Sequence, residues 1–222
     1  MNLTENLCIV GTGSQARYVI ENLQHISKYR LLGLVDIENP ENTGKKINGF
    51  DIKCVLEDIN KYFNPENCNV VIAYGNNIKK KEIARFLKRN KFNFASIISP
   101  NSYISSYVEI GEGCIINPNV TILPNTIIGN HVIIHSGCVI EHDNEIKDYA
   151  NIAPGVITAG YVQIGEGCFV YTASSITPKV KIGDWAIIGA GTVVRKNVKE
   201  HDVVAGNPAK SINRKRIGGK QE

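Results

Sequence analysis

Aliphatic residues recur at every sixth position through the second half of the chain. This series begins at Ile98 and continues without a slip to Val194; sixteen of its seventeen members are Ile or Val, and the exception is Thr158. A second series lies four residues later, from Ser102 to Thr192, and contains only small or medium-sized side chains. Because six is not a multiple of the 3.6 residues of an α-helical turn, the pattern excludes a long helix.

Short strands that each place one large and one small side chain in a narrow interior account for both series. Three such strands and three turns close a triangular coil, and coils stack through backbone hydrogen bonds. Glycine often follows the large residue, as at Gly111 and Gly129, where we expect turns with positive φ. The small series also contains cysteines, for which the pattern predicts a packing role: Cys114, Cys138 and Cys168. The sequence therefore predicts a parallel β-helix over residues 96–222.

Residues 1–95 follow a different pattern, in which short apolar strands alternate with helical segments. The expected elements are a strand at 7–10, a helix that ends near Ile26, strands at 31–35 and 70–73, and a Lys- and Arg-rich helix from 78 to about 90. Such alternation predicts a small parallel sheet.

The turn after the first strand of this domain is rich in glycine. Gly11, Gly13 and Ser14 lead into the helix, and glycines there let a helix N-terminus approach a phosphate. Asp36 ends the second strand, where an acidic residue can accept a ribose hydroxyl. The domain is half the size of a full dinucleotide fold, which favours a mononucleotide over NAD. The alternative is a tight β–α turn with Asp36 as an ordinary strand-end residue.

Together the two halves resemble a narrow family of hexapeptide-repeat sugar acetyltransferases of bacterial surface-glycan synthesis. It includes the bacillosamine-pathway and perosamine N-acetyltransferases and proteins similar to sialic acid O-acetyltransferases. The segments that carry the resemblance are Gly11–Ala16, Val35-Asp36, Ala73–Asn77, Ile140–Asp143, Ile152–Gly155 and Val204–Lys210. The resemblance implies an α/β + β fold, in which a small Rossmann-like N-terminal domain precedes a left-handed parallel β-helix. It also implies acetyl-CoA as cosubstrate, no required metal, and a homotrimer with sites between subunits.

The resemblance assigns the general base to His142, with Asp143 orienting it. The chemistry is reasonable, because a neutral imidazole can accept the proton of an attacking amine and a neighbouring carboxylate fixes its tautomer. Ile140 and Asn144 fall at inward positions, so residues 141–143 lie outside the core. The alternative is a solvated turn.

Further site residues follow from the resemblance. For the nucleotide-linked substrate they are Gly11, Gly13, Ser14, Asp36, Gly75, Asn76 and His135. For acetyl-CoA they are Asn151, Gly160, Gly206 and Lys210. The backbone N–H of Gly160 is expected to hold the thioester carbonyl, the alternative being an ordinary coil turn.

Two positions depart from the family pattern. Relatives usually carry Asn where this chain has His135, and they often carry His where it has Asn151, so the two residue types look exchanged. His131 is also unusual for its position, and we expect it to lie in an exposed turn.

The function expected from these features is transfer of acetyl to the amine of a nucleotide-linked amino sugar, such as a UDP-4-amino-4,6-dideoxy sugar. The alternative enzyme is an O-acetyltransferase acting on sialic acid or another small acceptor. A metal-dependent anhydrase would need three histidine ligands, and the spacing of His131, His135 and His142 does not fit one. A purely structural β-helix is disfavoured by the segment 206–210.

Composition narrows the setting. The net charge of +4 does not indicate nucleic-acid binding, although basic residues gather near the end, at Lys210, Arg214, Lys215, Arg216 and Lys220. No apolar run is long enough to insert into a membrane, and the first six residues show no signal-peptide pattern. The six cysteines lack CxxC spacing. We therefore expect a cytoplasmic protein.

Overall fold

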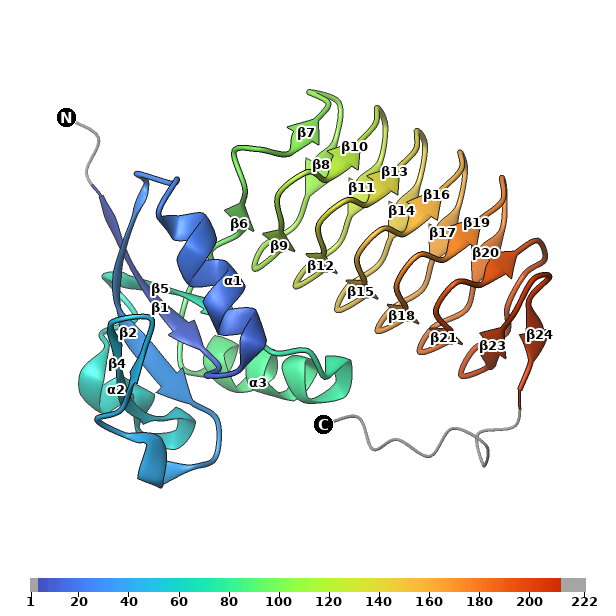
Figure 1. Cartoon of the computed structure of the whole chain (residues 1–222). Coiled ribbons are helices and arrows are strands. Elements are labelled where there is room, and N and C mark those ends of the chain that lie inside the picture. Colours follow the sequence, from blue (N-terminus) through green and yellow to red (C-terminus); the bar gives the residue numbers. More distant parts are fainter. Residues whose placement is uncertain (1–3, 213–222) are drawn as a thin grey trace. The chain divides into compact units, whose positions relative to one another are not determined.

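The computed structural model describes residues 4–212. The chain forms two compact units that are divided after Pro100 (Figure 1). The first unit contains a five-stranded sheet and helices, and the second is a stack of short parallel strands.

The sheet of the first unit has the strand order β3-β4-β2-β1-β5. Neighbouring strands are parallel except for the β3–β4 pair. Its strands are β1 (Glu5–Val10), β2 (Tyr29–Asp36), β3 (Lys46–Ile47), β4 (Phe50–Val55) and β5 (Cys68–Ile72). The helical elements are α1 (Ser14–Leu23), η1 (Pro40–Asn42), η2 (Leu56–Asp58), α2 (Ile59–Tyr62) and α3 (Asn77–Arg89), and β6 (Ile97–Ile98) ends the unit. The predicted strands and both predicted helices are present, whereas β3 and β4 were missed.

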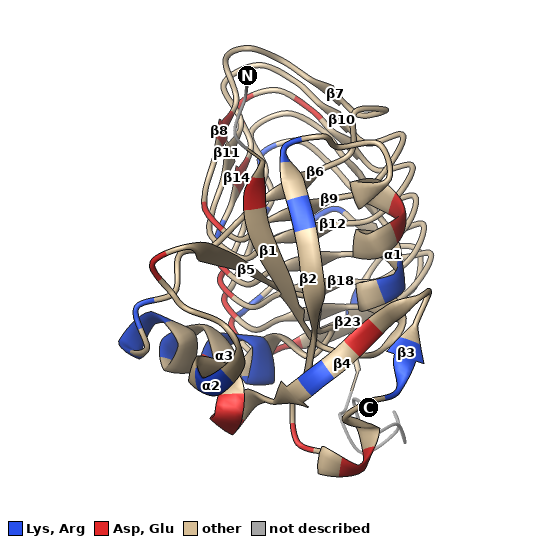
Figure 2. Ribbon diagram, turned by 90° about the vertical axis from the view of Figure 1, so that its left-hand side faces the viewer, with Lys and Arg blue, Asp and Glu red and all other residues tan. Residues whose placement is uncertain are grey.

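Both long helices bury one stripe of side chains. In α1 the buried residues include Ala16, Val19 and Ile20, at the spacing of one helix face. In α3 the buried face includes Ile83 and Leu87, while Lys and Arg cover much of the rest of the helix (Figure 2). The Lys- and Arg-rich pattern at 78–90 therefore belongs to an amphipathic helix.

Three sheets form the sides of the second unit, and each is named here after one of its strands. The β13 sheet contains β7 (Tyr103–Ile104), β10 (Thr121–Ile122), β13 (Val139–Ile140), β16 (Ile157–Thr158), β19 (Ser175–Ile176) and β22 (Val193–Val194). The β14 sheet contains β8 (Glu109–Ile110), β11 (Ile127–Ile128), β14 (Glu145–Ile146), β17 (Gln163–Ile164) and β20 (Lys181–Ile182). The β15 sheet contains β9 (Ile115–Ile116), β12 (Ile133–Ile134), β15 (Asn151–Ile152), β18 (Phe169–Val170), β21 (Ile187–Ile188), β23 (Val203–Ala205) and β24 (Lys210–Ser211).

The register of these sheets repeats every 18 residues, which is one coil of three strands. Ile140, for example, pairs with Ile122 on one side and with Thr158 on the other. The large series is buried throughout from Ile116 to Val194, and the small series from Cys114 to Thr192. Both predicted inward series are therefore confirmed, and the chain forms the expected parallel β-helix (Figure 1).

The glycines after the large residues have a different role from the one expected. Gly111 and Gly129 do not have positive φ; instead, a Cβ on Gly129 would lie 2.7 Å from the backbone nitrogen of Asp148 in the next coil. Positive φ occurs at every sixth residue from Gly113 to Gly191, directly before each small inward residue. Glycine after the large residue thus permits close stacking of coils, and the expectation of positive φ there was wrong.

Polar residues of the small series donate hydrogen bonds to the backbone as well as packing. Each donates to the carbonyl oxygen fifteen residues later, which belongs to the next coil. The donor–acceptor pairs are Cys114–Gly129 at 3.0 Å, Thr126–Glu141 at 2.9 Å, Cys138–Ala153 at 3.1 Å, Cys168–Gly183 at 3.0 Å and Ser174–Gly189 at 2.8 Å. Burial raises the pKa of Cys138 to about 11 and that of Cys168 to about 12, so both thiols keep the proton that they donate.

Candidate active site

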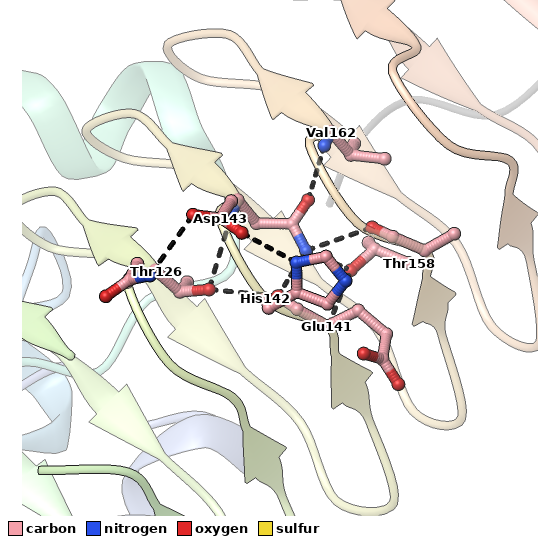
Figure 3. A network of polar contacts seen from close by, with 9 residues as sticks. Thr126, Glu141, His142, Asp143, Thr158 and Val162 are labelled. Atoms are coloured by element: carbon pink, nitrogen blue, oxygen red, sulfur yellow. Dashed lines mark hydrogen bonds and ion pairs between the residues drawn. The ribbon is translucent and has the colours of Figure 1, made fainter. Parts of the chain in front are cut away.

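The turn that follows β13 presents His142 and Asp143 to solvent. Nδ1 of His142 lies 2.6 Å from Oδ2 of Asp143, and the His142 side chain is 47% exposed (Figure 3). The hydrogen bond from His142 is the main cause that lowers the pKa of Asp143. Because an ionised carboxylate can only accept hydrogen bonds, the proton lies on Nδ1 and the lone pair of Nε2 is free to accept another proton.

Asp143 is held by residues from the two neighbouring coils. Nδ2 of Asn125 donates to its Oδ1 at 3.3 Å, and a hydrogen bond from Tyr161 contributes to its lowered pKa. The backbone N–H of Asp143 donates to the carbonyl oxygen of Pro124 at 3.0 Å. These contacts fix the carboxylate, which in turn orients the imidazole.

The next coil places Gly160 and Tyr161 against the His142 ring. The Tyr161 ring meets that of His142 edge-on, with 5.3 Å between the ring centroids. A Cβ on Gly160 would lie 2.6 Å from Cε1 and 2.8 Å from Nε2 of His142. The imidazole can therefore occupy this place only because residue 160 has no side chain.

Sequence reasoning missed Tyr161 and Asn125 as members of the site. The signal was available, because residues 18 apart lie side by side in consecutive coils. Asp143 minus 18 gives Asn125, and Asp143 plus 18 gives Tyr161.

His135 and Asn151 lie on neighbouring coils of the β15 sheet. Ile133 pairs with Asn151, and the N–H of His135 donates to the carbonyl oxygen of Ile152 at 2.9 Å. Because Ile152 points inward, Asn151 faces outward from the coil. Both side chains are buried. The predicted neighbourhood of these two residues thus agrees with the strand pairing.

One chain does not bring Asn151 to His142. Residues 141–144 join β13 to β14, so His142 lies at the corner between the β13 and β14 sheets. In a three-sided coil that corner is opposite the β15 sheet, from whose outer face Asn151 projects. The predicted base and the predicted acetyl-CoA contact are therefore on opposite sides of the β-helix.

His131 is not in an exposed turn, contrary to expectation. It is only 3% exposed, and its ring stacks on Tyr149 at 5.2 Å. A Cβ on Gly113 would clash with the His131 ring, so the histidine fills the space that the glycine leaves. His131 is a packed residue of the coil stack.

In the first unit, Gly11, Gly13 and Ser14 form the predicted glycine-rich turn. Gly11 has φ of 124°, and a Cβ there would lie 2.4 Å from the carbonyl oxygen of Ala73. Gly13 precedes α1 as its N-cap and makes no side-chain cap, and a Cβ there would meet nothing within 4 Å. The turn therefore combines a tight bend at Gly11 with open space before the helix at Gly13.

Asp36 is buried and accepts four hydrogen bonds from its own chain. Oδ1 accepts from the backbone nitrogens of Glu38 and Asn39, at 3.1 and 2.8 Å. Oδ2 accepts from Thr12 Oγ1 and Asn42 Nδ2, at 2.7 and 2.9 Å. Burial acts to raise the pKa of Asp36, but these hydrogen bonds outweigh it and lower the pKa. The predicted ribose contact stays a prediction, and it requires one of these donors to be displaced.

Gly75 and Asn76 precede α3. Asn76 is the N-cap of this helix, and its Oδ1 accepts from the backbone nitrogen of Lys79 at 3.0 Å. A Cβ on Gly75 would meet nothing within 4 Å. Asn76 therefore has a structural role in capping, in addition to the substrate contact predicted for it.

Near the end of the described chain, Lys210 lines a cavity of about 920 Å³. Arg195, Lys196 and Lys199 also line it, so four basic side chains share the walls with Glu200 and Asp202. Gly206 has φ of 96°, a conformation that favours glycine. The predicted contribution of Arg214, Lys215, Arg216 and Lys220 lies outside the described residues.

Two searches of residues 4–212 bear on the other function classes. Within this range, no helix has both the length and the apolar character needed to cross a membrane. The same residues contain no group of three or more His, Cys, Asp and Glu side chains that could hold a metal ion.

Comparison with known proteins identifies both parts of the chain. Residues 6–87 match the PglD N-terminal domain family, and residues 98–221 match the GMPPB C-terminal domain family. The GDP-perosamine N-acetyltransferase of Escherichia coli O157:H7 is 35% identical over 223 residues, which cover 93% of this chain and 96% of that protein.

Solved structures agree with this match. PerB from Caulobacter crescentus, in complex with CoA and GDP-perosamine, is 26% identical with a TM-score of 0.86, over 95% of this chain and 99% of that one. The acetyltransferase domain of PglB from Neisseria gonorrhoeae, in complex with acetyl coenzyme A, has a TM-score of 0.87 at 24% identity, over 95% of this chain and 100% of that one. The predicted fold class, a Rossmann-like domain followed by a left-handed parallel β-helix, is confirmed. The chain belongs to the family of hexapeptide-repeat, acetyl-CoA-dependent sugar acetyltransferases that its sequence resembles.

Proposed function

We propose that this protein transfers the acetyl group of acetyl-CoA to the amine of a nucleotide-linked amino sugar, with His142 as general base. The observation that carries the proposal is the His142–Asp143 contact of 2.6 Å, which leaves Nε2 of a half-exposed imidazole free to accept a proton. GDP-perosamine is the first acceptor to test, because it is bound to PerB and named for the Escherichia coli relative.

The reaction assigns a defined task to each group. The sugar amine attacks the thioester carbonyl carbon and forms the C–N bond while its proton passes to Nε2 of His142. The Asp143 carboxylate stabilises the imidazolium. The tetrahedral intermediate then collapses, the C–S bond breaks, and the imidazolium returns the proton to the sulfur of CoA. A backbone donor such as the N–H of Gly160 would stabilise the oxyanion.

The remaining predicted residues divide between the two substrates. We place the nucleotide at the glycine-rich turn before α1, because open space at Gly13 and helix N–H groups suit a phosphate. Gly75, Asn76 and His135 stay in the proposed sugar-nucleotide site. Asn151, Gly206 and Lys210 stay in the proposed acetyl-CoA site, and the basic walls of the cavity beside Lys210 suit the phosphates of CoA.

The functional unit that we propose is a homotrimer. His142 and Asn151 lie on opposite sides of one β-helix, so a site that contains both needs a second copy of the chain. Three copies arranged around a common axis would form three such sites.

We further propose that the protein works in the cytoplasm. Within the described residues all six cysteines are free and buried, which fits a reducing compartment.

An acceptor screen tests the proposed reaction. Release of CoA thiol is measured with acetyl-CoA and, in turn, GDP-perosamine, UDP-linked 4-amino sugars and free sialic acid. We expect turnover with a nucleotide-linked amine and N-acetyl product by mass spectrometry. Turnover with sialic acid alone would instead support the O-acetyltransferase, and no turnover with any amine acceptor would overturn the proposal.

A further inference from the structure

The interior of the β-helix becomes polar directly beneath the His142 turn. Asn144 is 2% exposed and occupies a position of the small inward series that elsewhere holds residues such as Val, Ala or Cys. Thr158, the exception in the large series, and Thr126 of the small series are also fully buried. Burying polar groups is costly unless they are hydrogen-bonded, and these three are bonded to one another and to the backbone (Figure 3).

Asn144 bonds to the turn that carries His142. Its Nδ2 donates to the carbonyl oxygen of Glu141, the residue before His142. Its backbone N–H donates to Oγ1 of Thr126 at 3.3 Å, and that hydroxyl donates to the same Glu141 carbonyl at 2.9 Å. The backbone on both sides of the pair His142–Asp143 is thus fixed from inside.

The same side chain also bonds to the turn of the next coil. Nδ2 of Asn144 donates to the carbonyl oxygen of Ala159 at 3.1 Å and to Oγ1 of Thr158 at 3.0 Å. Its Oδ1 accepts from the backbone nitrogen of Val162 at 2.7 Å. Ala159 and Val162 flank Gly160 and Tyr161, the two residues that contact the His142 ring.

We infer that Asn144 is a positioning residue of the active site, which sets the spacing between the base His142 and the backbone of Gly160. This inference rests on the proposed function. A base works only when it lies within hydrogen-bond reach of the proton it accepts, and displacement by about 1 Å costs about 100-fold in rate. Asn144 ties together the two turns whose separation decides that reach.

Ser174 provides a matched control, because it makes the same kind of bond elsewhere in the β-helix. Its Oγ donates to the carbonyl oxygen of Tyr171, three residues earlier, and to that of Gly189, fifteen residues later, both at 2.8 Å. Asn144 donates to carbonyls at the same two spacings. Ser174→Val removes donors of equal type from a turn without His142.

The test compares Asn144→Val, Asn144→Ser and Ser174→Val with the unmodified protein. Valine is common in this series, and serine at 144 keeps the two carbonyl bonds that Ser174 shows are possible. We expect kcat to fall by roughly 10- to 100-fold in Asn144→Val and by less in Asn144→Ser. We expect KM for acetyl-CoA to change by less than about twofold and Ser174→Val to keep its kcat.

Hydrogen exchange at the Val162 amide gives a readout that needs no activity. Both Asn144 variants should expose this amide to faster exchange, since it loses its acceptor, and Ser174→Val should not. Unchanged protection of Val162 in Asn144→Val, unchanged kcat in that variant, or an equal kcat loss in Ser174→Val would each overturn the inference. If Asn144→Val does not fold, a folded Asn144→Ser with unchanged kcat and unchanged Val162 exchange overturns it. Failure of the unmodified protein to acetylate any amine would overturn the proposed function instead, and the exchange result would then decide the clamp alone.

Discussion

A Cβ on Gly160 would lie 2.6 Å from Cε1 of His142, closer than side-chain carbons approach one another in proteins. The clash involves the movable end of a side chain that is 47% exposed. The fold can therefore accept a methyl group at residue 160, but the imidazole cannot stay where it is.

Gly160→Ala should consequently lower activity while leaving stability nearly unchanged. We expect kcat to fall by roughly 10- to 100-fold as His142 is displaced, with the melting temperature within a few degrees of the original. Gly165→Ala is the contrasting variant, because its Cβ would lie 2.5 Å from the backbone nitrogen of Asp184, which cannot move aside. That variant should lose stability. Full activity of Gly160→Ala would contradict the close approach of Gly160 to the ring.

His142→Ala tests the proposed base. Turnover should fall by roughly 100-fold or more, which is the usual scale for general-base catalysis. The dissociation constant of acetyl-CoA should barely change, because the proposed role concerns the proton of the acceptor. Thermal unfolding is the control: a structural histidine would lower the melting temperature together with turnover.

Light scattering on the purified protein tests the homotrimer. We expect three times the mass of one chain, because His142 and Asn151 lie on opposite sides of the β-helix and a site containing both requires a neighbouring copy. A monomer that retains full turnover at high dilution would show that Asn151 is not part of the site of His142.

Asp36→Asn tests the role of the buried carboxylate in the first unit. The pKa of Asp36 is lowered in the folded protein, so its stabilising effect is present above the unfolded pKa of about 3.9 and is lost as the pH falls through the folded value. At pH 7 we expect the variant to be less stable by about 1–3 kcal/mol, since Nδ2 of asparagine would face hydrogen-bond donors.

Urea unfolding at pH 7 and at a pH below 4 measures this effect. The difference between the variant and the unmodified protein should shrink at the lower pH. Asp51→Asn is the control, because Asp51 pairs with Lys46 and Lys53 at the surface and its loss should matter little. A constant difference at both pH values would show that ionisation of Asp36 does not stabilise the unit.

The β-helix could be predicted from sequence because every coil repeats the same two inward positions. Thr158 was visible as an exception, but its meaning was not, since its partner Asn144 is 14 residues away and contacts it only across coils. His131 was placed in an exposed turn because its stacking partner, Tyr149, is 18 residues away. Contacts across one coil are invisible until the 18-residue period is applied to the outward residues as well.

The first unit was less predictable where strands lie at the edge of its sheet. In β4, the buried residues Ile52 and Cys54 alternate with Asp51 and Lys53, so the segment lacks the continuous apolar run of β1. Strands in the middle of a parallel sheet are apolar on both faces, and a strand with a partly exposed face is not. The apolar strands were therefore found and this one was missed.

The last prediction concerns His135 and Asn151, each of which carries the residue type that relatives show at the other position. They lie on neighbouring coils of the β15 sheet, where Ile133 pairs with Asn151 and His135 bonds to Ile152. If they share a pocket, the double change His135→Asn with Asn151→His restores the family arrangement and should be tolerated better than the two single changes added together, because residues in contact couple non-additively. The decisive measurement is a double-mutant cycle in kcat/KM with the best acceptor. The pairing of adjacent coils gives a physical reason to expect an interaction energy of about 0.5–3 kcal/mol, and a value of zero within error would show that the two residues act separately.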